Sequence, residues 1–307
     1  MDHLQAIRLF VRVVETGSFT QAAQSLQVPP ATASKWVRAL ETHLGVALLE
    51  RTTRRVSVTT EGAAYYERTR HLLSELDDVE STLADTRSQL RGVLRVDTGA
   101  AAACHILMPS LPAFCAQHPD LQLRLSAMDR TADLVAEDID CALRITTNDP
   151  QLITRLVGTL HWSTVASPAW LAQHGSPTHP DDIVARRMPV AGYFSANTGR
   201  LLPLQFRQGT TTLTLEGVHH ALQISDSNVQ LAAALAGMGL IHTLDFMVRP
   251  AIEQGTLVPL LCDWRPDPVP LYVAYPPSRR YSTKVRVFAD WVEQVLASLP
   301  VPQTAPA

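Results

Sequence analysis

Two adjacent prolines, Pro29 and Pro30, divide two short helical patterns near the start of this 307-residue chain. Each proline disfavours helix in the residue before it, whereas Pro30 suits the first turn of a new helix. A helix over residues 19–26 therefore ends here, and the next helix runs from Pro30 to about Leu44, where Gly45 supplies a left-handed cap. The chain must place one short helix against another across a tight turn.

A further helix precedes this pair. Its apolar residues recur at helical spacing, at Leu4, Ile7, Val11 and Val14. Gly17 ends it, and Ser18 with Gln21 three residues later forms the pattern of a capping box. The sequence thus predicts three packed helices within the first 45 residues.

The helix after the prolines has two different faces when its residues are placed at 100° intervals. One face gathers Ala33, Val37, Leu40 and Leu44; the opposite face carries Ala31, Lys35, Arg38 and Thr42, flanked by Thr32 and Ser34. A basic, hydroxyl-rich outer helix after a tight turn is typical of a helix-turn-helix, whose second helix enters the major groove of DNA. A plain three-helix bundle with a solvated basic face is the alternative.

A basic hairpin follows these helices. Two short apolar segments within residues 48–59 flank a turn that holds Arg51, Arg54 and Arg55. Such a wing suits DNA phosphates or a narrow minor groove, and an exposed arginine-rich loop is the alternative. Residues 1–60 hold seven basic and four acidic residues, although the whole chain has a formal net charge of −3. This asymmetry indicates that only the N-terminal part meets a polyanion, unless it marks a solvated helix face.

A long helix with a heptad pattern comes next. Apolar and small residues alternate by four and three over about 25 residues, at Tyr65, Thr69, Leu72, Leu76, Val79, Leu83, Thr86 and Leu90. We expect this helix to pair with the same helix of a second copy through Leu72, Leu76, Val79 and Leu83. Pairing would present two recognition helices about one DNA turn apart. Packing on the chain's own body is the alternative.

Strands and helices alternate in the remainder of the chain. Strands are expected at 93–96, 121–125 and 139–145, and helices at 106–114, from Ala132 onward and at 229–236. This alternation predicts a parallel α/β sheet. The 46% of hydrophobic residues suffice for real cores, and only the tail after Pro300 is expected to be disordered.

Several classes of protein are disfavoured by the sequence. No Gly-rich phosphate loop follows a strand, no Gly-x-Ser-x-Gly motif is present, and the pair His219-His220 belongs to no metal-ligand pattern. We therefore expect neither an enzyme nor a cofactor or metal site. No apolar run reaches 18 residues, Met1-Asp2-His3 does not begin a signal peptide, and the four cysteines form no CxxC pair. The expected location is the cytoplasm, without a membrane segment.

The N-terminal motifs resemble those of LysR-type transcriptional regulators. The resemblance is carried by FTQAA (19–23), SKWVRALE (34–41), LG (44–45), ERTTRRV (50–56) and TEG (60–62), in the family's order and spacing. It continues at 166–171 and 275–291 and so spans nearly the whole chain. The resemblance implies an α/β protein with an N-terminal all-α winged helix-turn-helix (1–59), a dimerisation helix (60–90) and an effector-binding domain (91–300) ahead of the tail 301–307.

The resemblance also implies the partners of the first domain. Its expected partner is double-stranded promoter DNA, contacted by Ser18, Thr20, Pro30, Ala31, Thr32, Ser34, Lys35, Arg38, Arg51, Thr52, Thr53, Arg54 and Arg55. The start of the recognition helix lacks the Ser or Gln common in relatives, so base readout rests more on Thr32, Ser34, Lys35 and Arg38. Homodimers and homotetramers are implied, and contact with RNA polymerase is left open.

The effector-binding domain is expected to have two lobes, like bacterial solute-binding proteins. Lobe one would comprise 91–163 and 267–299, and lobe two 164–266. Ligands of such lobes bind outside the carboxyl ends of strands. The expected effector-binding residues are Thr98, Gly99, Ala100, Ala101, Arg144, Ser225, Asp226 and His242.

The charge of the effector is less clear from the sequence. Helix N-termini at two of these points favour an anion. However, Ala101 stands where many relatives have a hydroxyl residue that grips a carboxylate, so the effector is expected to be anionic or partly apolar. Arg144 could contact it, or could pair with a local acid such as Asp133 or Asp138.

Two alternative functions remain open on the sequence. Cys104 begins a helix near the expected crevice, and a helix N-terminus can lower the pKa of a thiol. The chain could thus be a redox-sensing regulator, unless Cys104 is simply a buried small hydrophobic residue. The other alternative is a small-molecule-binding protein whose N-terminal part has no role on DNA.

Overall fold

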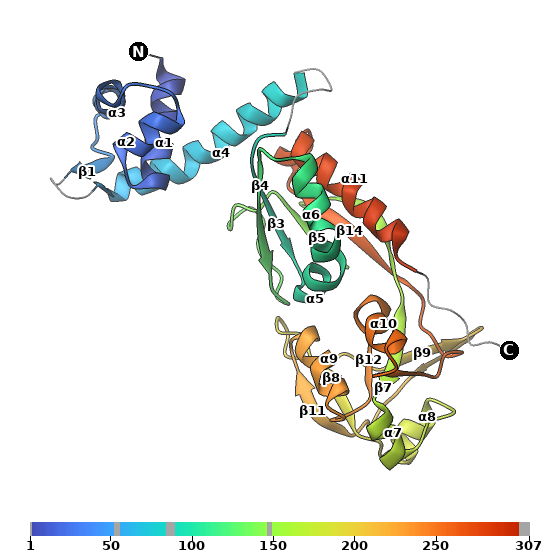
Figure 1. Ribbon diagram of the computed structural model, residues 1–307. Helices are drawn as coiled ribbons and strands as arrows, with labels where there is room; N and C mark the ends of the chain where they lie inside the picture. The colour runs from blue at the N-terminus through green and yellow to red at the C-terminus, as the bar shows by residue number, and fades with distance from the viewer. Residues whose placement is uncertain (1, 52–55, 84–89, 146–148, 301–307) are drawn as a thin grey trace. The chain divides into compact units, whose positions relative to one another are not determined.

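The computed structural model describes residues 2–51, 56–83, 90–145 and 149–300. The chain forms two compact units, Met1–Thr86 and Arg87–Ala307 (Figure 1). The first unit is built mainly from helices, and the second combines helices with mixed sheets. The predicted class, a helical N-terminal domain followed by an α/β body, is confirmed.

The helices of the first unit begin and end where their capping residues lie. They are α1 (His3–Thr16), α2 (Phe19–Ser25), α3 (Pro30–Leu44) and α4 (Thr60–Leu83), with a hairpin of β1 (Leu49–Arg51) and β2 (Val56–Val58) before α4. The Ser18 side chain accepts a hydrogen bond from the Gln21 amide, as the capping pattern predicts. Gly17 and Gly45 both adopt left-handed backbone angles after α1 and α3.

One core joins the four helices of the first unit. The apolar face predicted for α3 is buried at Ala33, Val37 and Leu40. Phe10 of α1 is fully buried, and its ring lies 5.7 Å from that of Tyr65 at the start of α4. This contact fixes the first turns of α4 against α1.

The hairpin is tied to the helices by specific polar contacts. The Glu41 carboxylate of α3 accepts hydrogen bonds from the amides of Leu48 and Leu49, at 2.9 and 3.1 Å. The Thr59 hydroxyl accepts from the Gly62 amide at the start of α4. A Cβ atom on Gly62 would lie 2.0 Å from the Leu48 carbonyl oxygen, so only glycine fits this crossing.

Lobe one of the second unit is built on a five-stranded sheet. Its strands lie in the order β4 (Leu121–Ala127), β3 (Gly92–Thr98), β5 (Cys141–Arg144), β14 (Val269–Tyr275) and β6 (Ile153–Leu160). β3 pairs in parallel with β4 and β5, but β14 pairs antiparallel with β5 and β6. The prediction of a parallel sheet is therefore wrong for β14, because this strand brings the chain back from lobe two and runs against its neighbours.

Two helical segments pack together over this sheet (Figure 1). The first is a continuous run of α5 (Ala100–Ala102), a π-helical turn (Ala103–Leu107) and α6 (Met108–Gln117), and the second is α11 (Thr283–Ser298). The Phe114 ring of α6 lies 4.6 Å from the Trp291 ring of α11. The run Ala100–Gln117 is long and apolar enough to pass for a membrane span. Ile106, Leu107 and Phe114 nevertheless lie in the lobe-one core, as in a core helix.

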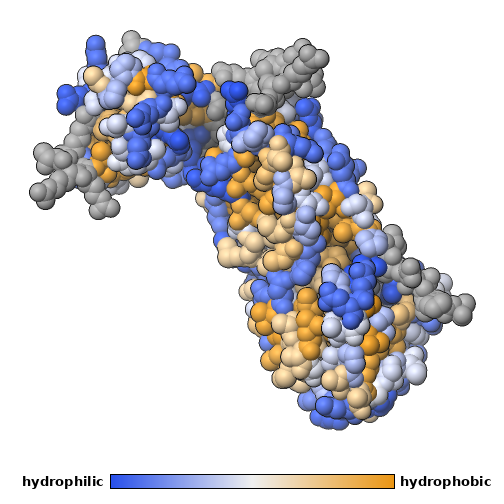
Figure 2. Space-filling model, in the orientation of Figure 1, coloured by the Kyte–Doolittle hydropathy of each residue, from blue (hydrophilic) through white to orange (hydrophobic). Residues whose placement is uncertain are grey.

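Lobe two contains smaller sheets. β7 (Trp162–Ala166) lies between β12 (Ile241–Leu244) and β13 (Val258–Leu260), antiparallel to both, while β8 (Val190–Tyr193) pairs in parallel with β11 (His220–Ile224), and β9 (Gln205–Gln208) forms a hairpin with β10 (Thr211–Thr214). The helices are α7 (Pro168–His174), α8 (Asp181–Ala185), α9 (Ser227–Leu235) and α10 (Asp245–Glu253). The chain enters this lobe between β6 and β7 and leaves it between β13 and β14. Hydrophobic and hydrophilic residues intermingle on the face of this unit seen in Figure 2.

Two local predictions fail. The helix expected from Ala132 is absent, since residues 131–140 form turns in which the Asp133 carboxylate accepts the amides of Val135 and Ala136. These bonds compete with helix formation. Leu90, assigned by its spacing to the long helix, is instead buried in the lobe-one core.

Candidate DNA interface and ligand cleft

The outer face of α3 presents two unpaired cations. Lys35 and Arg38 are exposed and lie opposite the buried residues of the same helix. Neither forms an ion pair with any residue that the structure describes. Arg12 of α1, in contrast, is held by Glu15 at 2.9 Å. The α3 cations are thus free to meet phosphates or base edges.

The other predicted residues of the two helices surround these cations in sequence. Thr20, Pro30 and Ala31 are exposed, and Thr32 and Ser34 are half-buried in the first turns of α3. Ser18 is half-buried as the cap of α2. Small and hydroxyl side chains therefore occupy the N-terminal end of α3, the end with which a recognition helix contacts bases.

The tip of the hairpin lies outside the described residues. This applies to Thr52, Thr53, Arg54 and Arg55, and to the side chain of Arg51, whose backbone ends β1. Leu49 pairs with Val58, and Arg51 pairs with Val56. The two strands therefore bring Arg51 and Val56, the residues on either side of the tip, next to each other.

The heptad positions of α4 divide into two groups. Tyr65 and Thr69 pack into the unit's own core, so for these two residues the predicted alternative of internal packing holds. Leu72 is 63% exposed, and Leu76 is half-buried. The side chains of Val79 and Leu83 lie outside the described part of the structure. An exposed leucine at the next heptad position leaves an apolar side chain of this unit in solvent.

A cavity of about 320 Å³ lies between the two lobes. It opens where β3 and β5 end, as expected for a crevice outside the carboxyl ends of strands. Five of the predicted residues line it: Thr98, Gly99, Ala101, Arg144 and His242. Ala100, Ser225 and Asp226 do not line the cavity. Asp226 caps α9 instead, since its carboxylate accepts the Val229 amide at 2.9 Å.

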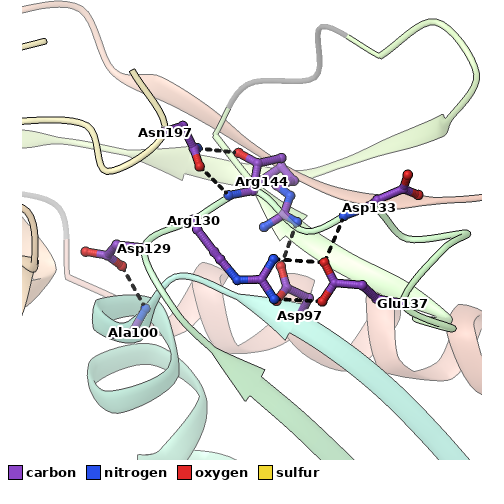
Figure 3. A network of polar contacts seen from close by, with 9 residues as sticks. Asp97, Ala100, Asp129, Arg130, Asp133, Glu137, Arg144 and Asn197 are labelled. Carbon is purple, nitrogen blue, oxygen red and sulfur yellow. Dashed lines mark hydrogen bonds and ion pairs between the residues drawn. The ribbon is translucent and has the colours of Figure 1, made fainter. Parts of the chain in front are cut away.

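Among the cavity residues that sequence analysis missed is Asp129, two positions after the end of β4. Its Oδ1 accepts a hydrogen bond from the Ala100 amide at 3.0 Å (Figure 3). Its Oδ2 accepts from the Ser227 amide at 3.0 Å and from the Ser227 hydroxyl at 2.9 Å. One carboxylate thus connects the first residues of α5 in lobe one and α9 in lobe two. The expectation that ligands bind outside the carboxyl ends of strands was applied to β3 and β5. Applied to β4 as well, it would have identified Asp129.

The arginines of the cavity are paired with acids (Figure 3). Arg144 lies 2.6 Å from the fully buried carboxylate of Asp97. The prediction of a pair with Asp133 or Asp138 is therefore wrong, since Asp97 on the neighbouring strand β3 provides the acid. Arg130 forms two parallel hydrogen bonds with Glu137, at 2.8 and 2.7 Å. The lowered pKa of Glu137 has this pairing as its largest cause.

Uncharged groups form the lobe-two side of the cavity. His242 stacks on Trp162 with ring centroids 5.0 Å apart, and its Nδ1 lies 2.9 Å from the Thr164 hydroxyl. Burial lowers the pKa of His242 to about 4, so the ring is neutral at pH 7. Burial also raises the pKa of Tyr193 to about 12, with the Asp129 charge as the second cause.

Cys104 and its neighbour face lobe two. Cys104 is exposed, which excludes the alternative that it is a buried hydrophobic residue. Its sulfur lies 3.9 Å from the Asn228 amide nitrogen, and the His105 Nε2 lies 2.9 Å from the Asn228 oxygen. Within the described residues, no group of three or more His, Cys, Asp or Glu side chains is arranged to hold a metal ion.

Two family models match the chain. Residues 4–63 match the bacterial regulatory helix-turn-helix protein of the lysR family, and residues 87–297 match the LysR substrate binding domain. An HTH-type transcriptional repressor of Pseudomonas aeruginosa is 36% identical over 307 residues, which cover 100% of this chain and 96% of the relative. The similarity therefore extends over both units.

Solved structures of full-length regulators show the same architecture. CrgA, a LysR-type transcriptional regulator from Neisseria meningitidis, matches with a TM-score of 0.62 and 29% identity, over 96% of this chain and 99% of that chain. AphB, a virulence activator of Vibrio cholerae, matches with a TM-score of 0.57 and 28% identity, over 94% and 98% of the two chains. The succession of a helix-turn-helix unit and a two-lobed body is thus shared with known regulators.

Proposed function

This chain belongs to the LysR family of bacterial transcriptional regulators, with a helix-turn-helix unit and an effector-binding domain. We propose a separate role for each of its two units. The first unit reads promoter DNA through α3, and the cavity between the lobes receives a small molecule. The observation that carries the DNA assignment is the pair of exposed, unpaired cations Lys35 and Arg38 on the outer face of α3.

The DNA contacts fall into two kinds. Lys35 and Arg38 reach base edges and phosphates in the major groove, and Thr32 and Ser34 add short polar contacts at the start of the helix. Arg51, Arg54 and Arg55, with Thr52 and Thr53, hold the backbone or the minor groove from the wing. Ser18, Thr20, Pro30 and Ala31 approach the phosphates at the helix N-termini.

A second copy of the chain completes the DNA-binding form. We assign the dimer seam to Leu72, Leu76, Val79 and Leu83 of α4, with the exposed Leu72 as its support. Two dimers would form a homotetramer on one promoter, where RNA polymerase also binds. The cytoplasm is the compartment in which such an assembly meets DNA. No catalytic step is assigned to any residue.

The effector acts by changing the position of one lobe relative to the other. Thr98, Gly99, Ala101 and Arg144 on lobe one and His242 on lobe two line the same cavity, so a bound molecule contacts both lobes. A ligand can shift an equilibrium only if it binds one state better than the other, and its effect on DNA affinity is then reciprocal.

The direct test uses the DNA upstream of the protein's own gene. Fluorescence anisotropy with purified full-length protein should give a much tighter Kd for that fragment than for a random duplex at the same salt concentration. Footprinting should protect two half-sites about one helical turn apart. Equal affinities for both duplexes would refute the proposal and favour a small-molecule-binding protein without a DNA role.

A further inference from the structure

The cleft contains a carboxylate of its own at a position where a ligand anion would be expected. Asp129 accepts the Ala100 amide with one oxygen, and the Ser227 amide and hydroxyl with the other. Ala100 begins the continuous helical run Ala100–Gln117, and Ser227 begins α9. The free amides at the start of a helix attract negative charge, and here the protein supplies that charge itself.

The space around this carboxylate is also taken. A Cβ atom on Gly99 would lie 3.3 Å from Asp129 Oδ1, so the backbone approaches the carboxylate closely. A second carboxylate at the same amides would have to displace Asp129 or share the site with it. Two carboxylates that bind the same amides repel each other strongly when they are partly buried.

The cations of the cavity offer an anion little compensation. The Arg130 guanidinium donates two hydrogen bonds to the Glu137 carboxylate, and Arg144 is paired with the buried Asp97. With Asp129, which also lines the cavity, three acids therefore accompany two arginines. His242 adds no positive charge, because its ring is buried and neutral. Each arginine that lines the cavity is thus paired with an acid, and these five charged groups together have a net charge of −1.

One uncharged group at the cavity lacks a partner of any kind among the described residues. The Thr98 hydroxyl is fully buried at the edge of the cavity and has no hydrogen-bond partner among the described residues. A buried hydroxyl without a partner costs free energy that a ligand group can recover. Apolar and aromatic side chains line the same cavity, including Leu202, Phe246 and the Trp162 ring stacked on His242.

We propose that Asp129 is the resident carboxylate of the cleft, and that the effector is an uncharged molecule with an apolar or aromatic body and a hydrogen-bonding group for Thr98. This inference rests on the proposed function only in calling the ligand an effector. It names the class of molecule that the cavity accepts and excludes simple carboxylates from that class.

A pair of probes with the same ring tests the preference of the cleft. The melting temperature of the purified full-length protein is measured with benzamide and with sodium benzoate at equal ionic strength. Benzamide should raise the Tm more than benzoate does. The Thr98→Val variant, which keeps the shape but loses the hydroxyl, should lose most of the benzamide shift. A wild-type protein that responds to benzoate as much as to benzamide overturns the proposal.

Removal of the resident carboxylate tests its role directly. Asp129→Ala should lower the Tm, and sodium acetate should restore part of it relative to sodium chloride, because acetate can occupy the vacated amides. The same variant should bind benzoate about tenfold more tightly than the wild type does. If Asp129→Ala does not fold, Asp129→Asn removes the charge and keeps the shape, and its benzoate affinity is measured instead.

The matched control is Asp133→Ala. Asp133 lies in the same loop and caps two local amides, but it makes no contact with lobe two in the described residues. Its variant should show no acetate response, like the wild type. Absence of an acetate response in Asp129→Ala overturns the proposal. Because no readout uses DNA, these outcomes do not depend on whether the chain binds a promoter.

Discussion

Thr131 and Asn197 are joined by two hydrogen bonds across the cleft between the lobes. The Thr131 amide donates to the Asn197 Oδ1 at 3.2 Å, and the Asn197 Nδ2 donates to the Thr131 hydroxyl at 2.9 Å (Figure 3). Thr131 lies in the loop that follows β4 in lobe one, and Asn197 in the loop that follows β8 in lobe two. This pair therefore joins the same two lobes that Asp129 connects through Ala100 and Ser227.

Asn197→Ala should loosen the two lobes without unfolding either. Each exposed hydrogen bond contributes at most about 1 kcal/mol, so we expect faster hydrogen exchange around the cleft and a small loss of stability. Thr198→Ala is the control, because the Thr198 hydroxyl accepts only the local Arg200 amide in the described contacts. Equal exchange rates in the two variants would show that the Thr131–Asn197 pair does not hold the lobes together.

Lys35→Ala should weaken binding to the operator more than to random DNA. A side chain that reads base edges contributes about 1–3 kcal/mol of discrimination, whereas a phosphate contact acts on all sequences alike. The measurement is the ratio of the two Kd values at one salt concentration. Arg124→Ala removes the same charge from an exposed position of lobe one and should leave that ratio unchanged. An equal loss on both duplexes would make Lys35 a phosphate contact.

The wing gives a prediction of a different kind. The double substitution Arg54→Ala and Arg55→Ala should weaken binding to every duplex and reduce the salt slope of log K by up to about two. The slope is obtained from Kd values over a series of salt concentrations. A slope equal to that of the wild type would remove the wing from the DNA contacts.

Leu72→Glu should weaken self-association. An exposed leucine on a heptad position loses its apolar contact, and the new charges on two facing helices repel each other. Sedimentation equilibrium should show a larger monomer fraction at the same protein concentration. Ala63→Glu introduces the same charge at an exposed residue on the opposite face of α4 and is the control. A dimer that resists Leu72→Glu would place the interface elsewhere.

The lowered pKa of His242 predicts that the protein loses stability in weak acid. Its pKa is lowered from 6.5 to about 4 in the folded protein, so the unfolded chain binds more protons below pH 6.5. Stability linked to the neutral ring is therefore present above pH 6.5 and is lost as the pH falls towards 4. Between pH 7 and pH 5 the loss amounts to about 2 kcal/mol.

Urea unfolding of His242→Gln at these two pH values measures that contribution. The variant should be less stable than the wild type at pH 7 but should lose less stability on going to pH 5. His219→Gln, at an exposed position of the same lobe, should follow the wild-type curve. A wild-type pH dependence in His242→Gln would mean that other groups cause the loss.

The first unit was largely predictable from its sequence because its signals are local. Ser18, Gly17 and Gly45 act within one helical turn, and the buried face of α3 follows from helical spacing alone. The identity of the exposed cations followed in the same way, since a residue opposite the buried face of a surface helix points to solvent.

The second unit was predictable in class but not in detail. The direction of β14 depends on where the chain returns from lobe two. This return comes about 100 residues after the end of β6, where the chain leaves lobe one. The partner of Arg144 is Asp97, 47 positions earlier, brought close because β3 and β5 are neighbours in the sheet. No local pattern distinguishes Asp97 from the acids nearer to Arg144 in the sequence.

The sequence alone determined the family, the order of the parts and the exposed basic face of α3, because short-range spacing controls helices and caps. Only the tertiary structure decided what the cleft contains. Asp129 reaches Ala100 and Ser227 from 29 and 98 positions away. The charge of a site is the sum of groups brought together by folding, so it becomes readable only when the strands and lobes are in place.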